Sequence, residues 1–307
     1  MDPLTALAAA AVTLGTPLLL AGLGELVAER SGVLNLGVEG VMLVGAVTGF
    51  AVAVATREPW LAVAAALAVG AVLGGVHAAL TVGLGVEQVT AGLALALFGT
   101  GLSAFLGKPL IGIPNPVPFR ALAVPGLAAL PVAGPVLFRQ DALVYLAYAL
   151  AVAAWWWLDH TRSGLRLRAC GEHPEAADAM GVNVAAVRAG AVVAGGALAG
   201  LAGAYLSLAY TPAWTEHMTG GLGWIAIALV IFGTWRPLRL AAGAVLFGAV
   251  DALGFRAQVL GVETSAILLR MLPYLFTLGV LFVITVLRRR GGAGVPEALA
   301  RPYRREA

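Results

Sequence analysis

Residues 162–188 read RSGLRLRACGEHPEAADAMGVNVAAVR and are the longest polar, charged stretch between apolar runs of this chain. Pro174 suits a first helical position, Glu175 follows in the first turn, and Gly181 is typical of a residue just beyond a helix end. The pattern therefore predicts a short helix from Glu175 to Met180. A short polar helix between two apolar runs suits docking to a soluble partner.

The composition indicates a membrane protein. Of 307 residues, 60% are hydrophobic and only 11% are charged, whereas soluble domains carry about 25% charge. Apolar runs of roughly 20 residues can each cross a hydrocarbon layer about 30 Å thick. The 40 glycines would let membrane helices approach closely. We expect an all-α, polytopic integral membrane protein in which 1–307 is a single transmembrane domain.

The apolar runs predict about nine transmembrane helices, within a range of eight to ten. They lie at 6–23, 33–56, 60–82, 89–106, 142–158, 189–210, 224–234, 240–255 and 265–287. The run at 224–234 is short enough to be a half-helix or re-entrant element, which is tolerated only where it is buried in protein. Seven prolines forbid a continuous helix across 107–141. We expect an extracytoplasmic, proline-rich loop there, with short helices.

The basic residues set the expected orientation. If the loop at 159–188 is cytoplasmic, alternation places 13 of the 19 Lys and Arg residues on that side: Arg30, Arg162, Arg166, Arg168, Arg188, Arg236, Arg239, Arg288, Arg289, Arg290, Arg301, Arg304 and Arg305. The positive-inside rule then favours an outside N-terminus and a cytoplasmic tail at 288–307. This distribution explains the net charge of +3 without a nucleic-acid partner. The chain would cross its membrane several times, with lipid as the surroundings.

Catalytic and metal-binding patterns are missing from the sequence. The four histidines lack metal-ligand spacing, and neither an HExxH nor a GxSxG pattern occurs. The segment GLSAFLGK at 101–108 has the wrong glycine spacing for a phosphate loop, and Pro109 stands where Ser or Thr is needed. Cys170 is the single cysteine and is expected to be a free cytoplasmic thiol. The sequence predicts no catalytic residue, no metal and no cofactor.

Four polar residues within or beside apolar runs are candidates for a substrate pathway. Asn35 and Glu39 are one turn apart, so they can share a helix face. They would either line a polar gate near the cytoplasmic mouth or make a hydrogen bond that packs two helices together. The cost of burying a charge favours the second alternative. Asp251 and Arg270 each lie about one turn from the end of a run. Both would face a substrate cavity or extend to the lipid headgroups.

A weak internal echo joins residues 30–45 and 219–233. Each has a glycine-rich start, an apolar run and a closing Gly, and the two cross in opposite directions in the expected topology. Inverted repeats in transporters look like this, although chance is an equal explanation in so glycine-rich a chain.

Three stretches resemble a known family. They are AERSGVLNLGVEGVMLVGA at 28–46, RACGEHPEAADAMGVNVAAVRAGAVVAGGALAGLAGAYLSL at 168–208, and GGLGWIAIALVIFGTWRP at 220–237. They are similar to permease subunits of bacterial ABC importers, in the branched-chain amino acid/ribose/nucleoside permease superfamily. The wording of 28–46 is closest to the nucleoside and simple-sugar group. With similar span spacing, the resemblance covers nearly the whole chain.

The resemblance implies a non-enzymatic transport subunit with the ABC importer permease fold, located in the bacterial cytoplasmic (inner) membrane and working by alternating access. Such permeases pair with a second, related permease, sit on ATP-binding cassette ATPase subunits, and receive substrate from an extracytoplasmic binding protein. Carried over by position, ATPase coupling falls to Arg168, Gly171, Glu172, His173, Pro174, Ala177, Met180 and Gly181. Cys170 departs from the usual small aliphatic residue, and Glu87 from an expected Asn. Nucleosides are the first expectation for the substrate, followed by ribose-type sugars and branched-chain amino acids.

Two rival functions stay open from the sequence. An ion- or proton-coupled secondary carrier would need carboxylates at mid-membrane, and Glu39 is the only plausible one in the predicted spans. A membrane scaffold or enzyme would not need the polar helix between the fifth and sixth runs.

Overall fold

The computed structural model describes residues 2–259, 271, 275, 276, 278, 279, 282 and 294–303. Within them, seven helices are long and apolar enough to cross a membrane. They are α1 (Pro3–Arg30), α2 (Val38–Thr56), α3 (Pro59–Ala78) with its π-helical end η1 (Ala79–Gly83), α4 (Gln88–Gly107), α6 (Ala142–His160), α9 (Val184–Tyr205) with its π-helical end η4 (Leu206–Tyr210), and α11 (Pro237–Val259). A shorter apolar helix, α10 (Leu222–Phe232), corresponds to the predicted half-helix.

The predicted count of nine spans is not confirmed. Seven spans and the short α10 account for the first eight predicted runs. The ninth run, 265–287, falls mostly outside the described residues, and Arg270 lies outside them. The membrane class and the helical fold agree with the prediction.

Side-chain caps start several of these helices where an apolar run begins. The carboxylate of Asp141 accepts hydrogen bonds from the backbone N–H groups of Leu143 and Val144, and Asn183 accepts one from Ala186. Such caps satisfy N–H groups that a helix leaves unpaired in its first turn. Asn183 therefore begins α9 earlier than the predicted start at residue 189.

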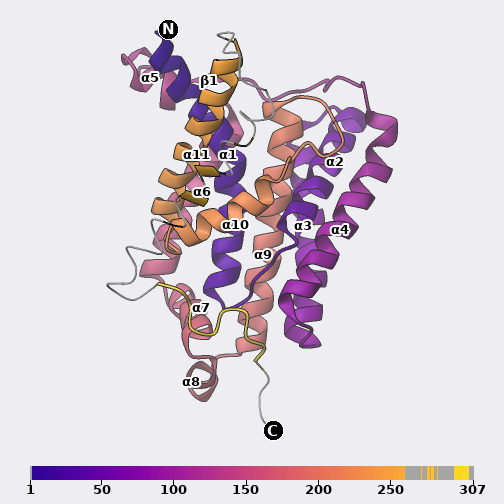
Figure 1. Ribbon diagram of the computed structural model, residues 1–307, viewed down its shortest axis with the longest axis vertical. Coiled ribbons are helices and arrows are strands. Elements are labelled where there is room, and N and C mark those ends of the chain that lie inside the picture. Colours follow the sequence, from indigo (N-terminus) through magenta and orange to yellow (C-terminus); the bar gives the residue numbers. More distant parts are fainter. Residues whose placement is uncertain are drawn as a thin grey trace.

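Helices α1 and α9 form the centre of the bundle, with α2, α3 and α11 packed around them (Figure 1). Glycines make these contacts close. A Cβ atom on Gly70 of α3 would overlap the carbonyl oxygen of Gly196 on α9, and one on Gly45 of α2 would overlap the backbone of Gly200. Close backbone approach of this kind is how membrane helices gain packing contacts without large apolar side chains.

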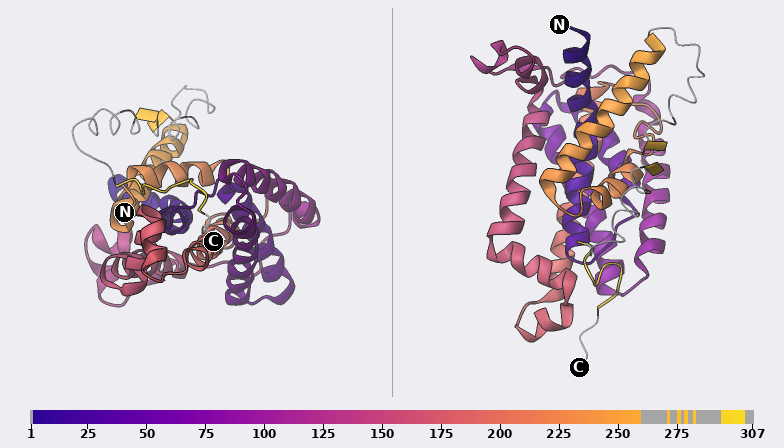
Figure 2. Two further views of the ribbon diagram at one scale, coloured as in Figure 1. Left: turned by 90° about the horizontal axis from the view of Figure 1, so that it is seen from below. Right: turned by 60° about the vertical axis from the view of Figure 1, so that its left-hand side comes forward.

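The two ends of the bundle differ in charge. One end carries α7 (Arg162–Glu172), α8 (Pro174–Ala179) and residues 294–303, as Figure 2 shows; we call it the basic end. The described basic residues at or beside it are Arg30, Arg162, Arg166, Arg168, Arg188, Arg236, Arg239 and Arg301. The N-terminus of α1 lies at the opposite end (Figure 1). The helix arrangement thus groups the described basic residues as the sequence predicts, and the positive-inside rule would turn the basic end to the cytoplasm.

The proline-rich segment 107–141 covers the opposite end. It contains η2 (Lys108–Leu110), β1 (Leu122–Ala123), η3 (Leu127–Ala129), α5 (Ala133–Leu137) and β2 (Arg139–Gln140). The two-residue strands pair antiparallel, with Leu122 opposite Gln140, which the all-α prediction did not include. Residues before proline avoid the helical region, so this segment has extended stretches that can pair. It is tied to the bundle by a hydrogen bond from the Phe119 N–H to the Leu208 carbonyl, 3.0 Å.

Candidate functional site

The segment between α6 and α9 is helical rather than a loop. Helix α7 was not predicted; it begins where Thr161 accepts a hydrogen bond from the Gly164 N–H, 3.0 Å. His173 has non-helical backbone angles and separates α7 from α8. Helix α8 begins at Pro174 and ends at Ala179, with Gly181 at φ +81°. The predicted short helix and its glycine stop are therefore present, because Gly adopts this left-handed conformation without steric cost.

The eight predicted coupling residues divide into two groups by exposure. His173, Met180 and Gly181 are exposed, and Met180 is 84% exposed. Arg168 and Glu172 are half-buried, while Gly171, Pro174 and Ala177 are buried. His173, Met180 and Gly181, together with the 42% exposed side chain of Glu172, can be reached from outside, whereas Gly171, Pro174 and Ala177 pack inside the protein.

Helix α7 is fastened to the end of α1. A Cβ atom on Gly171 would overlap the carbonyl oxygen of Arg30, and the Arg30 guanidinium lies 3.6 Å from the Glu172 carboxylate. Ala177 of α8 packs in one apolar cluster with Cys170 and Val184, the first residue of α9. Packing thus connects α7 to the end of α1 and α8 to the start of α9.

Residues 294–303, the described part of the predicted tail at 288–307, pack onto the same region. The Ala298 N–H donates to the Gly171 carbonyl, 2.9 Å, and the Ala300 N–H donates to the Gly32 carbonyl, 3.2 Å. The Arg188 guanidinium donates to the Arg301 carbonyl, 3.1 Å. The tail thereby joins α7, the end of α1 and the start of α9, a connection that sequence analysis did not predict.

Cys170 is a free cysteine, as the sequence predicted, but it is not accessible. It is fully buried, since α7 turns this face toward α8, the start of α9 and the tail residue Tyr303. Burial raises the pKa of the Cys170 thiol, and the positive charge of Arg188 partly opposes that shift.

A second polar site lies where α2 begins. Residues 31–37 are not helical, and Gly32 has φ +96°, so the predicted span starting at residue 33 begins instead at Val38. Asn35 and Glu39 consequently do not share a helix face. Both are buried, and the Asn35 side-chain oxygen accepts from the Gly37 N–H, 2.9 Å, just before α2.

Glu39 holds the N-terminal end of α10. Its carboxylate accepts three hydrogen bonds, from the Thr219 hydroxyl at 2.6 Å, the Gly221 N–H at 2.9 Å and the Gly223 N–H at 2.7 Å. A carboxylate is favoured at a helix N-terminus because unpaired N–H groups and the helix dipole are positive there. Glu39 therefore joins the first turn of α2 to the start of α10, the two segments that the internal echo had paired. The repeat itself stays a prediction.

Two further buried carboxylates were missed by the sequence analysis. Glu25 and Glu29 are 2% and 1% exposed, because α1 continues to Arg30 rather than ending near residue 23. Glu25 accepts from the Asn35 N–H, 2.8 Å, and Glu29 accepts from the Trp235 indole N–H, 2.5 Å. Their four-residue spacing places them on one helix face. This spacing was the sequence signal from which a buried pair of carboxylates could have been predicted.

A cavity of about 500 Å³ lies beside the start of α10. Its walls come from α1, η4, α10, α11 and the segment before α10, and its lining residues are Leu14, Pro17, Leu206, Tyr210, Met218, Thr219, Gly220, Leu222, Ile225, Asp251 and Phe255. Mostly apolar walls with a few polar groups are typical of small-molecule sites. Of the predicted pathway residues, Asp251 lines this cavity and Glu39 lies behind it, bonded to Thr219. Asn35 is not among the lining residues.

Comparison with known proteins identifies the family. A family model described as the permease component of the branched-chain amino acid transport system matches residues 7–285. This chain belongs to that permease family. The permease is 43% identical to a putative glucose ABC transporter permease of Haloferax volcanii, with 97% of each chain covered. It is 33% identical to a guanosine ABC transporter permease of Bacillus subtilis, over 96% of this chain and 95% of that one.

A nucleoside ABC transporter permease of Lactococcus lactis is 34% identical, over 87% of this chain and 88% of that one. No solved structure matches this chain. The family and the seven apolar helices establish a multi-pass integral membrane protein that is a transport subunit rather than a catalyst.

Proposed function

We propose that this permease carries nucleosides into the cell by alternating access, driven by separate ATPase subunits that dock on α8. The observation that carries the proposal is the position of Met180, which is 84% exposed at the end of α8. A large apolar side chain held in the open at the basic end is unfavourable in water, and it suits insertion into a partner's pocket.

The path from α8 to the cavity is continuous. Helix α9 begins at Val184, in the cluster that holds Ala177, and continues through η4 to Tyr210, which lines the cavity. At a rise of 1.5 Å per residue this 27-residue element is about 40 Å long. A push on α8 would tilt α9 and move Leu206 and Tyr210. The same movement would also reach Leu14 and Pro17 on the α1 side of the cavity, because Gly171 of α7 contacts Arg30 at the end of α1.

The remaining parts of the proposal follow from the basic charge and from the family. The basic end would face the cytoplasm, where ATP-binding cassettes are available, and the opposite end would receive substrate from an extracytoplasmic binding protein. A second, related permease subunit would complete the pathway. Glu39, the carboxylate on which an ion-coupled carrier would depend, already accepts three protein hydrogen bonds, which favours ATP coupling over ion coupling.

Charge at Met180 tests the docking surface. In the reconstituted complex, Met180→Asp is expected to abolish copurification of the ATPase subunits and the ATPase stimulation caused by loaded binding protein. Met180→Leu should retain both, because it preserves the apolar contact. Since Met180 is exposed, both variants should fold alike. Full stimulation with Met180→Asp would refute docking on α8.

The nucleoside assignment is supported by names of relatives and by the cavity. Tyr210 and Phe255 could stack on a base, and the Asp251 carboxylate could accept hydrogen bonds from ribose hydroxyls. A glucose-type sugar is the second candidate, favoured by the 43% identical relative. Uptake of labelled uridine and of labelled glucose, each measured with and without the other compound as competitor, separates the two candidate substrates. Asp251→Asn should weaken uptake of the true substrate at least about tenfold, the effect of losing one charged hydrogen bond.

A further inference from the structure

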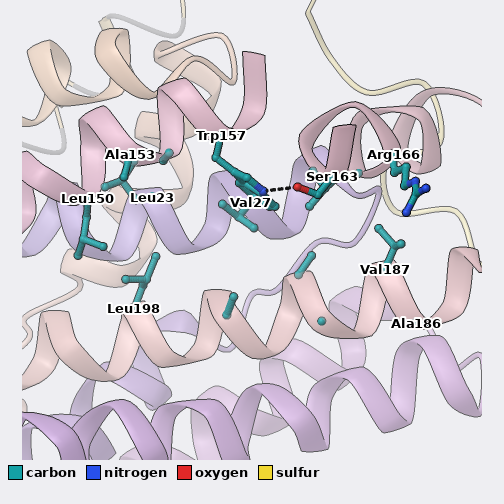
Figure 3. Close-up of a pocket in the computed structure, with 15 residues that line it drawn as sticks. Leu23, Val27, Leu150, Ala153, Trp157, Ser163, Arg166, Ala186, Val187 and Leu198 are labelled. Carbon is teal, nitrogen blue, oxygen red and sulfur yellow. Dashed lines mark hydrogen bonds between the residues drawn. The ribbon is translucent and has the colours of Figure 1, made fainter. Parts of the chain in front are cut away.

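A second cavity, of about 570 Å³, is a groove between α1, α6, α7 and α9 (Figure 3). Leu23, Leu150 and Leu198 line one part of it, and Trp157, Ser163 and Arg166 line the part beside α7. It is distinct from the α10 cavity, because the two share no lining residue. The groove separates α6 from α9, the two helices that α7 and α8 connect.

The groove has the length of one lipid leaflet. Along α9 its lining extends from Ala186 to Leu198, which is about 18 Å at 1.5 Å per residue. Half of a hydrocarbon core about 30 Å thick is about 15 Å. The groove also ends at the right depth, because Trp157 and Ser163 lie where α6 ends and α7 begins. Tryptophan is typical of the headgroup region.

Polar groups gather only at the α7 end of the groove. The Trp157 indole N–H donates to the Ser163 hydroxyl, 2.8 Å (Figure 3). Arg166 is exposed and makes no hydrogen bond or ion pair with the part of the chain that the structure describes. No carboxylate is among the lining residues. The groove therefore combines an apolar body with a free positive charge at its headgroup end.

We propose that this groove binds one anionic phospholipid from the leaflet at the basic end. An acyl chain would lie between α6 and α9, and the phosphate would accept hydrogen bonds from Arg166. Basic pockets between transmembrane helices bind anionic headgroups in this way. The lipid would fill the space between the two helices that flank the coupling helices, whichever substrate the permease carries. It would thus brace α6 against α9.

Lipid retention by the full-length protein tests the proposal. The purified, delipidated chain would be incubated with phosphatidylglycerol or phosphatidylcholine, and bound lipid would be counted by native mass spectrometry. We expect one retained phosphatidylglycerol per chain and a weaker signal for phosphatidylcholine. Arg166→Gln should lower phosphatidylglycerol retention about fivefold, the factor that corresponds to about 1 kcal/mol per basic residue.

Two matched variants separate this site from general attraction. Arg162→Gln removes the same charge from an exposed position of α7 outside the groove, and should leave retention unchanged. Ala194→Phe puts a ring into the groove and should reduce retention of both lipids. Equal loss in the Arg162 and Arg166 variants, or equal retention of the two lipids, would overturn the proposal. The proposal would also be overturned if the chain formed dimers without bound lipid and Ala194→Phe dissociated them. That result would show that a protein helix, rather than a lipid, occupies the groove.

Discussion

Replacing Glu39 with alanine tests the junction between α2 and α10. The change removes the acceptor for the Thr219 hydroxyl and for the N–H groups of Gly221 and Gly223. Thr219 and Gly223 are buried, while Gly221 is half-buried and can reach water. A buried donor without a partner costs about 1–3 kcal/mol, so two give about 2–6 kcal/mol. At about 2–4 °C per kcal/mol, the apparent midpoint of thermal unfolding should fall by about 4–24 °C.

The assay is thermal unfolding of the full chain in detergent, followed by tryptophan fluorescence. Glu39→Gln keeps one acceptor oxygen but turns an N–H₂ group toward the N–H groups of α10, so its midpoint should lie between those of Glu39→Ala and the wild type. Glu58→Ala is the control, because Glu58 is exposed and precedes α3 without a side-chain cap bond. It should change the midpoint by under about 2 °C. If the unfolding midpoint of Glu39→Ala equals that of the Glu58→Ala control, then Glu39 does not hold α10.

Two other predictions follow from packing and burial. Gly203→Ala should lower the unfolding midpoint by the equivalent of about 1–3 kcal/mol, because its Cβ atom would overlap the carbonyl of Met42. Gly101→Ala, a helical position with open space around it, should be neutral or slightly stabilising, and equal losses in both would contradict tight α2–α9 packing. Cys170 should react with maleimide at least about tenfold more slowly than a cysteine introduced by Arg162→Cys, because only the thiolate reacts and burial raises the Cys170 pKa. Its rate should still be rising at pH values where the exposed thiol has reached its plateau, and matching pH profiles would show that α7 does not cover it.

Much of the membrane fold was predictable because its signals are local. Runs of apolar residues mark the helices, and the first eight predicted runs each correspond to a helix. The short helix after Pro174 was predictable from Pro, Glu and Gly within a few residues. The ends were less accurate: α1 continues past Glu25 and Glu29, because carboxylates that accept hydrogen bonds inside the bundle need not end a helix.

The candidate sites were only partly predictable. The coupling region was found from its polarity, but which of its residues are exposed depends on how α7 packs on Arg30 and on the tail. Asp251 was selected for its charge within an apolar run, and the cavity that it lines could not be seen in the sequence. The groove at Arg166 was not predicted, since its α1 wall is distant in sequence from its walls on α6, α7 and α9.

The amino-acid sequence alone establishes a polytopic helical membrane protein with a polar helix between two spans, because hydrophobicity and helix signals act over a few residues. The partners of Glu39 could be known only from the folded chain. Thr219 and Gly223 are 180 and 184 residues away in sequence, so no periodicity of the chain encodes the contact. The packing of α2 beside α10 brings these residues together, and the low-polarity interior makes their hydrogen bonds to Glu39 necessary for α10 to begin there.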